Sequence, residues 1–202
     1  MTLRPGGRWG LRERATAIVL AGGSATRMGC DKALLPVEGR PLVMHVIEQL
    51  RPHFERVILS ARSRDAYEAP GIDVVADVRG GEGPLMGIAC GLRASTDDLN
   101  LVVACDIPEI DMPLARRLLR EADGFDAVVP RHGENVEPLF AVYRRTLVER
   151  MDEMLAAGHR RIRAVLDRSR VRWVEIPDSA AVGNLNTRDD YAAYLARRRE
   201  PG

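Results

Sequence analysis

The sequence predicts an α/β fold: a three-layer sandwich in which a mostly parallel, Rossmann-like sheet lies between helices. Short β-branched runs alternate with amphipathic segments from residue 16 onward, as in chains built from βα units. The strand expected at Asn100–Ala104 is almost continuously apolar, which is typical of a strand buried on both faces. The length of 202 residues fits one domain over residues 15–202. The Gly- and Arg-rich residues 1–14 are expected to form a flexible tail or, alternatively, a basic arm.

The strands are expected where short apolar runs are separated by turn residues or by helical patterns. In chain order they are Thr16–Leu20, Arg56–Ser60, Asp73–Ala76, Asn100–Ala104, Ala127–Val129, Pro138–Tyr143 and Val171–Ile176.

The helices are expected where apolar residues recur every three or four positions near a start or stop signal. Proline suits the first turn of a helix, Gly158 provides a stop, and Thr187 with Asp190 forms an acidic capping box. In chain order the helices are expected after Pro41, after Gly83-Pro84, at about Pro113–Ala122, at Leu147–Ala157, at Ile162–Leu166 and after Thr187.

Composition argues against several classes of partner. The formal net charge of +1 provides no overall field toward a polyanion, and an aromatic share of 4% offers little surface for base stacking. Nucleic acid and membrane are therefore not expected as partners, and no apolar run approaches the roughly 20 residues of a membrane-spanning helix. Cys30, Cys90 and Cys105 form no Cys-x-x-Cys pair, which favours reduced thiols in the cytoplasm.

A glycine-rich loop follows the first strand directly. Leu20–Gly29 reads Leu-Ala-Gly-Gly-Ser-Ala-Thr-Arg-Met-Gly, and glycines at such a junction let backbone N–H groups approach a phosphate. Arg27 and Lys32 add two cations, which would meet a triphosphate and neutralise charge on a leaving pyrophosphate. The alternative is a tight β-to-α turn whose two cations are merely solvated.

Two aspartates follow apolar strands. Asp106 stands just past Ala104 and Asp77 just past Ala76, at carboxyl ends, where open α/β sheets place their ligands. One well-placed carboxylate suffices to anchor Mg²⁺, which completes its shell with phosphates and water. Alternatively, Asp106 caps the turn before Pro108.

Two polar or glycine-rich segments leave their roles open. Gly80–Gly87 could approach a base or ribose, or could be a linker into the next helix. Asn184 and Asn186 could bind substrate or metal-bound water, or could simply form the turn before the last helix.

These motifs together resemble the molybdenum cofactor guanylyltransferases, within the nucleotide-diphospho-sugar transferase type of fold. The resemblance covers about residues 16–198. Its markers are Leu-Ala-Gly-Gly-x-x-x-Arg-Met-Gly with a following Asp-Lys, then Gly83-Pro84-Leu85 with Gly87, Cys105-Asp106-x-Pro108 and Asn184-x-Asn186-Thr187. Related enzymes that act on other nucleotides and acceptors share the first motif, but the double glycine looks like the guanylyl version.

The resemblance implies a role for each matching residue. It implies that Arg27, Lys32 and Asp106 act in catalysis and that Asp106 holds Mg²⁺. Asn184 and Asn186 would lie near the acceptor phosphate. Ser60 stands where the family often has a nucleotide-contacting asparagine, and Arg188 where proline is usual. The implied nucleotide-binding residues are Leu20, Ala21, Gly22, Gly23, Lys32, Ser60, Asp77 and Asp106.

The activity that the resemblance implies is transfer of GMP from GTP to molybdopterin with release of pyrophosphate. Molybdoenzymes or other cofactor-biosynthesis proteins are further expected partners. One alternative is a nucleotidyltransferase that uses CTP or another phosphate acceptor. A second is a nucleotide-binding protein that delivers the cofactor without catalysing transfer.

Overall fold

The computed structural model describes residues 12–22, 31–67, 69–76, 83–177 and 183–199. Within them, one sheet contains eight strands and a separate hairpin contains two. The strands of the large sheet are β1 (Glu13–Ala21), β4 (Phe54–Ala61), β5 (Asp73–Ala76), β6 (Leu99–Ala104), β7 (Ala127–His132), β8 (Asn135–Val136), β9 (Phe140–Arg144) and β10 (Val171–Glu175). The hairpin consists of β2 (Pro36–Val37) and β3 (Arg40–Pro41).

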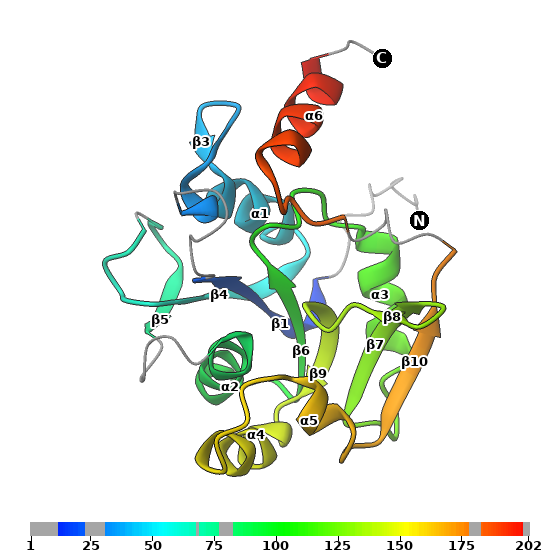
Figure 1. Cartoon of the computed structure of the whole chain (residues 1–202). Coiled ribbons are helices and arrows are strands. Elements are labelled where there is room, and N and C mark those ends of the chain that lie inside the picture. Colours follow the sequence, from blue (N-terminus) through cyan, green and yellow to red (C-terminus); the bar gives the residue numbers. More distant parts are fainter. Residues whose placement is uncertain (1–11, 23–30, 68, 77–82, 178–182, 200–202) are drawn as a thin grey trace, which may run out of the picture.

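The large sheet has the strand order β10-β7-β9-β6-β1-β4-β5, with β8 paired to β7 (Figure 1). The pairs β1–β4, β1–β6, β4–β5 and β7–β10 are parallel. β9 runs antiparallel to both of its neighbours, β6 and β7. The prediction of a mostly parallel α/β sheet is therefore confirmed, with one reversed strand near its middle.

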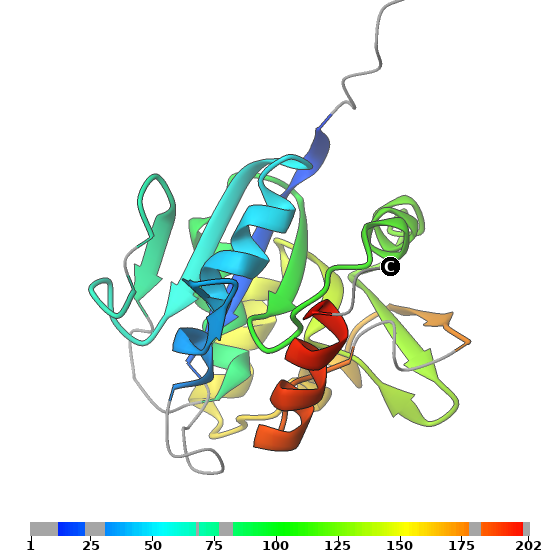
Figure 2. The same cartoon turned by 90° about the horizontal axis from the view of Figure 1, so that it is seen from above.

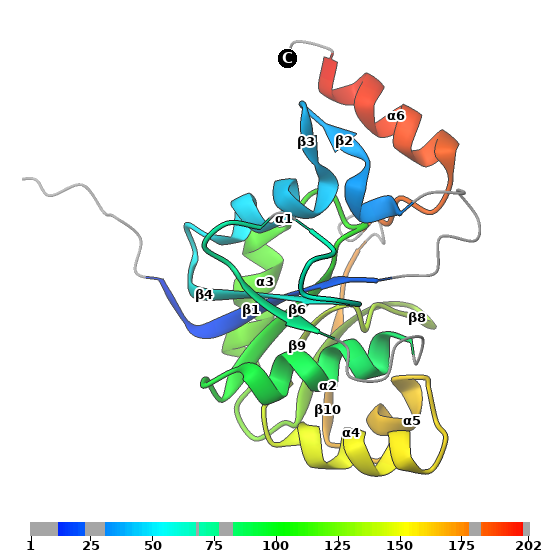
Figure 3. The same ribbon diagram turned by 90° about the vertical axis from the view of Figure 1, so that its left-hand side faces the viewer.

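Helices cover both faces of this sheet, which gives the three layers seen in Figure 3. On β1, the buried Ala17 and Val19 face the layer of α1 and α3, whereas Ile18 faces the layer of α2, α4 and α5. This strict alternation follows from the two-residue period of a strand. The helices are α1 (Leu42–Leu50), α2 (Pro84–Ala94), α3 (Met112–Arg120), α4 (Leu147–Ala156), α5 (Arg163–Leu166) and α6 (Arg188–Arg199).

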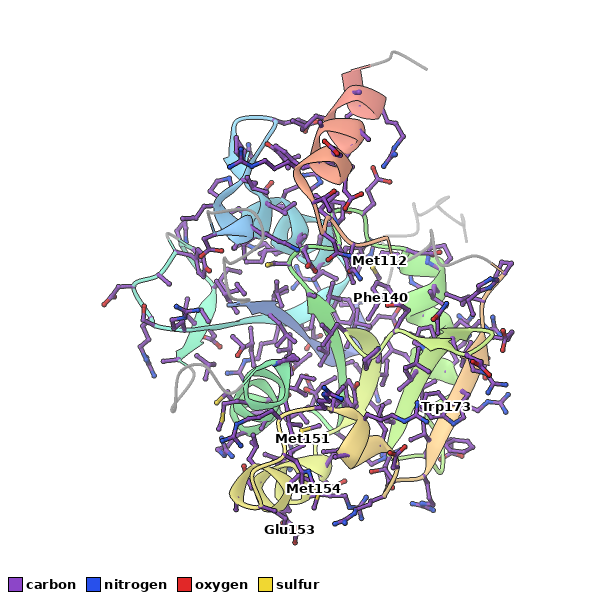
Figure 4. The ribbon with its side chains drawn as sticks, viewed as in Figure 1. Met112, Phe140, Met151, Glu153, Met154 and Trp173 are labelled. Atoms are coloured by element: carbon purple, nitrogen blue, oxygen red, sulfur yellow. The ribbon has the colours of Figure 1, made fainter. Side chains whose placement is uncertain are left out.

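The helices α2 and α4 pack closely in the layer that also contains α5. A Cβ on Gly91 of α2 would lie 2.5 Å from Cγ2 of Ile18, so only glycine allows α2 to approach β1 this closely. On α4, Met151 and Met154 point into the protein while Glu153 points outward (Figure 4). These contacts fix α2, whose first turn lies near the carboxyl ends of β1 and β4.

α6 lies outside the three layers, against the β2–β3 hairpin and α1 (Figure 2). Val37, Leu42, Leu185 and Tyr194 form a third apolar cluster there, which we call the outer cluster. The predicted capping box is confirmed: Thr187 Oγ1 accepts from the Asp190 N–H at 3.1 Å, and Asp190 accepts from the Thr187 N–H at 2.8 Å. No described helix combines the length and apolar character needed to cross a bilayer.

The structure corrects the predicted boundary between the tail of residues 1–14 and the folded part. β1 begins at Glu13, because the Glu13 N–H donates to the His53 carbonyl at 2.7 Å and its carboxylate pairs with Arg116 at 3.0 Å. Glu13 and Arg14 therefore belong to the sheet, while residues 1–11 lie outside the described residues. β9 likewise begins at Phe140 rather than at the predicted Pro138.

Candidate active site

The carboxyl ends of four parallel strands meet at one edge of the sheet. Leu20 at the end of β1 stands opposite Ser60 of β4 and opposite Ala104 of β6. Ala76, which ends β5, is paired with Ala61 of β4 at the same edge. The carboxyl ends of β1, β4, β5 and β6 therefore all lie at the edge expected to hold a ligand.

The backbone of the glycine-rich loop begins to turn at Gly22. Its φ of +152° lies in a region that L side chains rarely adopt, so a side chain at this position would be strained. Arg27 and Gly23, together with the rest of residues 23–30, lie outside the described residues, and so does Asp77.

Lys32 and Asp106 lie together although 74 residues separate them. The ammonium Nζ of Lys32 is 3.2 Å from Oδ2 of Asp106 and donates to Oδ1 of Asn186 at 3.4 Å. The two side chains of the ion pair are 26% and 24% exposed, so a ligand can reach both from solvent. Within the described residues, the Asp106 carboxylate thus faces a cation and does not cap the turn before Pro108.

Backbone hydrogen bonds hold Asp106 in this position. The Cys105 N–H donates to the Leu20 carbonyl at 3.0 Å, and the Leu185 N–H donates to the Asp106 carbonyl at 2.8 Å. These bonds connect the end of β1, the end of β6 and the segment before α6. Burial raises the pKa of the Cys105 thiol, with a further contribution from the Asp106 carboxylate, so Cys105 stays a neutral packing residue and not a nucleophile.

The oxygen atoms around this cluster suit a hard divalent cation. Asp106 contributes a carboxylate and Asn186 an amide oxygen. Two residues before Asn186 in the chain, Oδ1 of Asn184 is buried, and no donor from the described residues lies within hydrogen-bond distance of it. No group of three or more His, Cys, Asp or Glu in the described part of the chain could hold a metal alone. This donor set fits Mg²⁺, which commonly takes one or two protein carboxylates and fills its remaining positions with phosphate and water.

Ser60 is buried, and its hydroxyl already has a hydrogen-bond partner. Its side chain is 3% exposed, and its hydroxyl donates to the Gly87 carbonyl in α2 at 2.9 Å. A Cβ on Gly87 would be 3.4 Å from both Ser60 Oγ and a methyl group of Leu20. Ser60 therefore links the end of β4 to the first half of α2, directly beside Leu20.

Two residues that support Lys32 have no role assigned from the sequence, although Asp31 is part of the Asp-Lys marker. Asp31 caps the 3-10 helix η1 (Lys32–Leu34), and its Oδ2 accepts from the Tyr67 hydroxyl at 2.6 Å. The Asp31 cap had a local signal, because aspartate commonly bonds to the N–H two residues on. Tyr67 had none, since its partner is 36 residues away.

The composition of the chain also singles out Lys32. It is the only lysine in the chain, and all other members of the 30 Lys plus Arg residues are arginine. A chain that uses arginine at every other cationic position has kept the compact ammonium at this one.

Comparisons with known proteins agree with this arrangement. Residues 17–173 match the family model of the MobA-like NTP transferase domain. A probable molybdenum cofactor guanylyltransferase from Pelotomaculum thermopropionicum is 36% identical, over 85% of this chain and 84% of that protein. A molybdenum cofactor guanylyltransferase from Syntrophotalea carbinolica is 34% identical, over 93% of this chain and 92% of that protein.

A solved structure shows the same architecture. The crystal structure of molybdopterin-guanine dinucleotide biosynthesis protein A from Archaeoglobus fulgidus superposes with a TM-score of 0.78 at 26% identity. The match covers 91% of this chain and 98% of that one. With strand-end geometry, motifs and near full-length similarity in agreement, the chain belongs to the molybdenum cofactor guanylyltransferases of the MobA-like NTP transferase family.

Proposed function

We propose that this protein transfers GMP from GTP to a phosphate of molybdopterin and releases pyrophosphate. The observation that carries the proposal is the convergence of Lys32, Asp106 and Asn186 at the carboxyl edge of the sheet. Relatives that are named molybdenum cofactor guanylyltransferases match most of the chain. An acceptor phosphate oxygen attacks the α-phosphorus, the bond to the bridging oxygen breaks, and pyrophosphate leaves with the displaced charge.

Each residue of the cluster has a task in this reaction. Lys32 donates to phosphate oxygens and stabilises charge on the leaving group, as fixed cations do in phosphoryl-type transfers. Asp106, with an amide oxygen of Asn184 or Asn186, would hold a divalent cation, for which we propose Mg²⁺. When bound, such an ion would supply positive charge that offsets the negative charge of the triphosphate. The acceptor phosphate is already ionised, so no strong general base is needed.

The resemblance assigns the remaining nucleotide contacts. Leu20, Ala21 and Gly22 end β1 and begin the loop at the edge where Lys32 lies. Gly23, Arg27 and Asp77 keep the roles that the resemblance implies, and they lie outside the described residues. Ser60 supports this surface through Gly87. For Asn184 and Asn186 we propose the role that the resemblance implies, contact with the acceptor phosphate.

Pyrophosphate release from each of the four nucleoside triphosphates, measured with molybdopterin and MgCl₂, tests the substrate assignment. GTP should give the highest kcat/KM. Preference for CTP would replace guanylyl by cytidylyl transfer. Tight GTP binding without pyrophosphate release would refute the transferase proposal and favour the alternative of a nucleotide-binding protein that delivers the cofactor.

Replacing Asp106 with alanine tests the metal assignment. We expect Asp106→Ala to lower kcat by at least about 100-fold, because a metal ligand contributes several kcal/mol to transition-state stabilisation. The fold should be retained, since this carboxylate is partly exposed and belongs to none of the three apolar clusters. Asp123→Ala, at an exposed turn position, is the matched control and should keep full turnover. An Asp106→Ala enzyme with wild-type turnover would contradict the assignment.

A further inference from the structure

The direction of the Lys32 side chain depends on a short 3-10 turn. Lys32 is the first residue of η1, which is only three residues long, so it has little regular backbone to fix it. The cap residue Asp31 supplies the missing restraint, because its Oδ1 accepts from the Ala33 N–H at 3.0 Å. Ala33 is completely buried, which anchors the turn to the layer of α1.

The second carboxylate oxygen of Asp31 is held from another part of the chain. Tyr67, in the segment between β4 and β5, is 8% exposed and donates its hydroxyl to Asp31 Oδ2 at 2.6 Å. Burial, together with the Asp31 carboxylate, raises the pKa of the Tyr67 phenol, so it remains a donor at neutral pH. Both oxygens of Asp31 are therefore engaged by donors other than Lys32.

This engagement matters because Asp31 and Asp106 are both carboxylates near one ammonium. An aspartate with a free oxygen next to Lys32 in sequence could attract Nζ and draw it away from the site. With Oδ1 given to Ala33 and Oδ2 to Tyr67, the ammonium of Lys32 instead lies 3.2 Å from Asp106 and 3.4 Å from Asn186.

We propose that Tyr67 is a positioning residue: its hydroxyl fixes Asp31 as the cap of η1 and thereby directs Lys32 toward Asp106 and Asn186. The inference deepens the proposed function, on which it rests, because Lys32 is the residue assigned to the triphosphate. Tyr67 itself touches neither Lys32 nor the proposed ligands, so its effect passes through Asp31.

The single lysine of the chain gives a direct readout that needs no nucleotide. An amine-reactive reagent modifies only Lys32 and the chain's amino terminus, and peptide mass spectrometry separates the two. We expect Lys32 to react several-fold faster in Tyr67→Phe than in wild type, because the ammonium is no longer held in one place. Asp31→Ala should give the same increase, and the double variant should react no faster than either single variant.

Tyr143→Phe is the matched control. Its buried hydroxyl also donates one hydrogen bond, to the Pro138 carbonyl at 2.7 Å, but it lies in the core on the α2–α4 side. Both Tyr→Phe variants should lose similar thermal stability, while only Tyr67→Phe should change Lys32 labelling. Asp31→Asn is a second control: its amide oxygen can still accept from the Ala33 N–H and its amide nitrogen can donate to the Tyr67 hydroxyl, so Lys32 labelling should stay close to the wild-type rate. If Asp31→Ala fails to fold, the comparison of Tyr67→Phe with Tyr143→Phe still decides the proposal.

Turnover completes the test and separates the two proposals. With GTP, MgCl₂ and molybdopterin, Tyr67→Phe should lower kcat about tenfold, as expected for losing one hydrogen bond to a charged group. Tyr143→Phe should not. Equal Lys32 labelling in Tyr67→Phe and wild type overturns the positioning role whatever the activity. A wild-type protein that releases no pyrophosphate from any nucleotide refutes the proposed function alone, and the labelling rates still decide the role of Tyr67.

Discussion

At the scale of single residues, the site depends on one compact cation between two kinds of oxygen. Nζ of Lys32 reaches the Asp106 carboxylate and the Asn186 amide oxygen at the same time. An ammonium has three donors on a flexible stem and can meet oxygens in different directions, whereas a guanidinium donates in one plane.

Replacing Lys32 with arginine should therefore impair the enzyme although the charge is kept. We expect Lys32→Arg to lower kcat/KM for GTP by about 10- to 100-fold, because the larger planar group cannot reproduce both contacts. Steady-state pyrophosphate release measures this loss. Arg120→Lys, the reverse exchange at the exposed last residue of α3, is the control and should change nothing. Full activity of Lys32→Arg would show that charge alone suffices.

The residues of the site differ in how far the sequence could predict them. Asp106 was predictable because it follows an apolar strand, and Lys32 because it follows a glycine-rich loop. The cap formed by Asp31 had a local signal, but its bond to Tyr67 was not predictable, because it joins two loops that have no periodic pattern. The burial of Ser60 was likewise hidden, since it depends on where α2 crosses β4.

At the scale of elements, the docking of α6 is held by a polar contact at its centre. The Tyr194 hydroxyl lies 3.2 Å from Nε2 of His45 on α1, and Arg198 pairs with Glu38 of the hairpin at 2.6 Å. Glu38 has a φ of +50° and Gly39 a φ of +79°, so both occupy the positions of a tight turn that needs positive φ. This turn presents Glu38 to α6.

The stability of this docking should depend on the protonation of His45. Burial, followed by the charge of Arg198, lowers the pKa of His45 from 6.5, so the folded protein prefers the neutral ring. The unfolded chain then binds more protons, and stability falls as pH drops from 6.5 toward the folded-state pKa. Nearby Glu38 and Glu109 oppose the shift without reversing it.

Urea unfolding at pH 7.5 and pH 5.5 measures this dependence. His45→Gln should lose less stability on acidification than wild type. We expect the difference to be below about 1 kcal/mol, because the half-buried ring is partly screened by solvent. His159→Gln, at an exposed position, should behave as wild type. The same pH dependence in all three proteins would contradict the assignment.

Local signals predicted the last helix but not its partner. The Thr187–Asp190 cap is contained within four residues, and it formed as expected. The β2–β3 hairpin was missed because each strand has only two residues, too few to show an alternation. Docking of α6 on this hairpin joins positions about 160 residues apart, as the Glu38–Arg198 pair shows.

At the scale of the whole molecule, the sheet is organised around β1. β1 is central, paired with β4 and β6 and buried by helices on both faces. The sequence predicted the alternation of strands and helices, since each strand has its own apolar run. Strand order and the reversed direction of β9 depend on contacts between distant segments, and no local pattern encodes them.

Hydrogen exchange should reproduce this organisation. We expect the amides of β1 and β6, including the fully buried Ala17, Ile18 and Val102, to exchange slowest, because they are released only by global unfolding. Peptides from the edge strand β10 and from the β2–β3 hairpin should exchange earlier. Mass spectrometry of the native protein in deuterated buffer gives these rates. Exchange of β1 as fast as that of β10 would contradict the central placement.

The outer cluster anchors the segment that carries Asn184 and Asn186 separately from the two main apolar cores. Leu185 between them anchors the segment in that small cluster, apart from the apolar layers on the two faces of the sheet. Substitutions in residues 183–199 can therefore alter the groups that face Lys32 and Asp106 while both main cores stay intact. If Asn184 and Asn186 contact the acceptor as proposed, substitutions in this segment can change acceptor preference with little loss of folding stability.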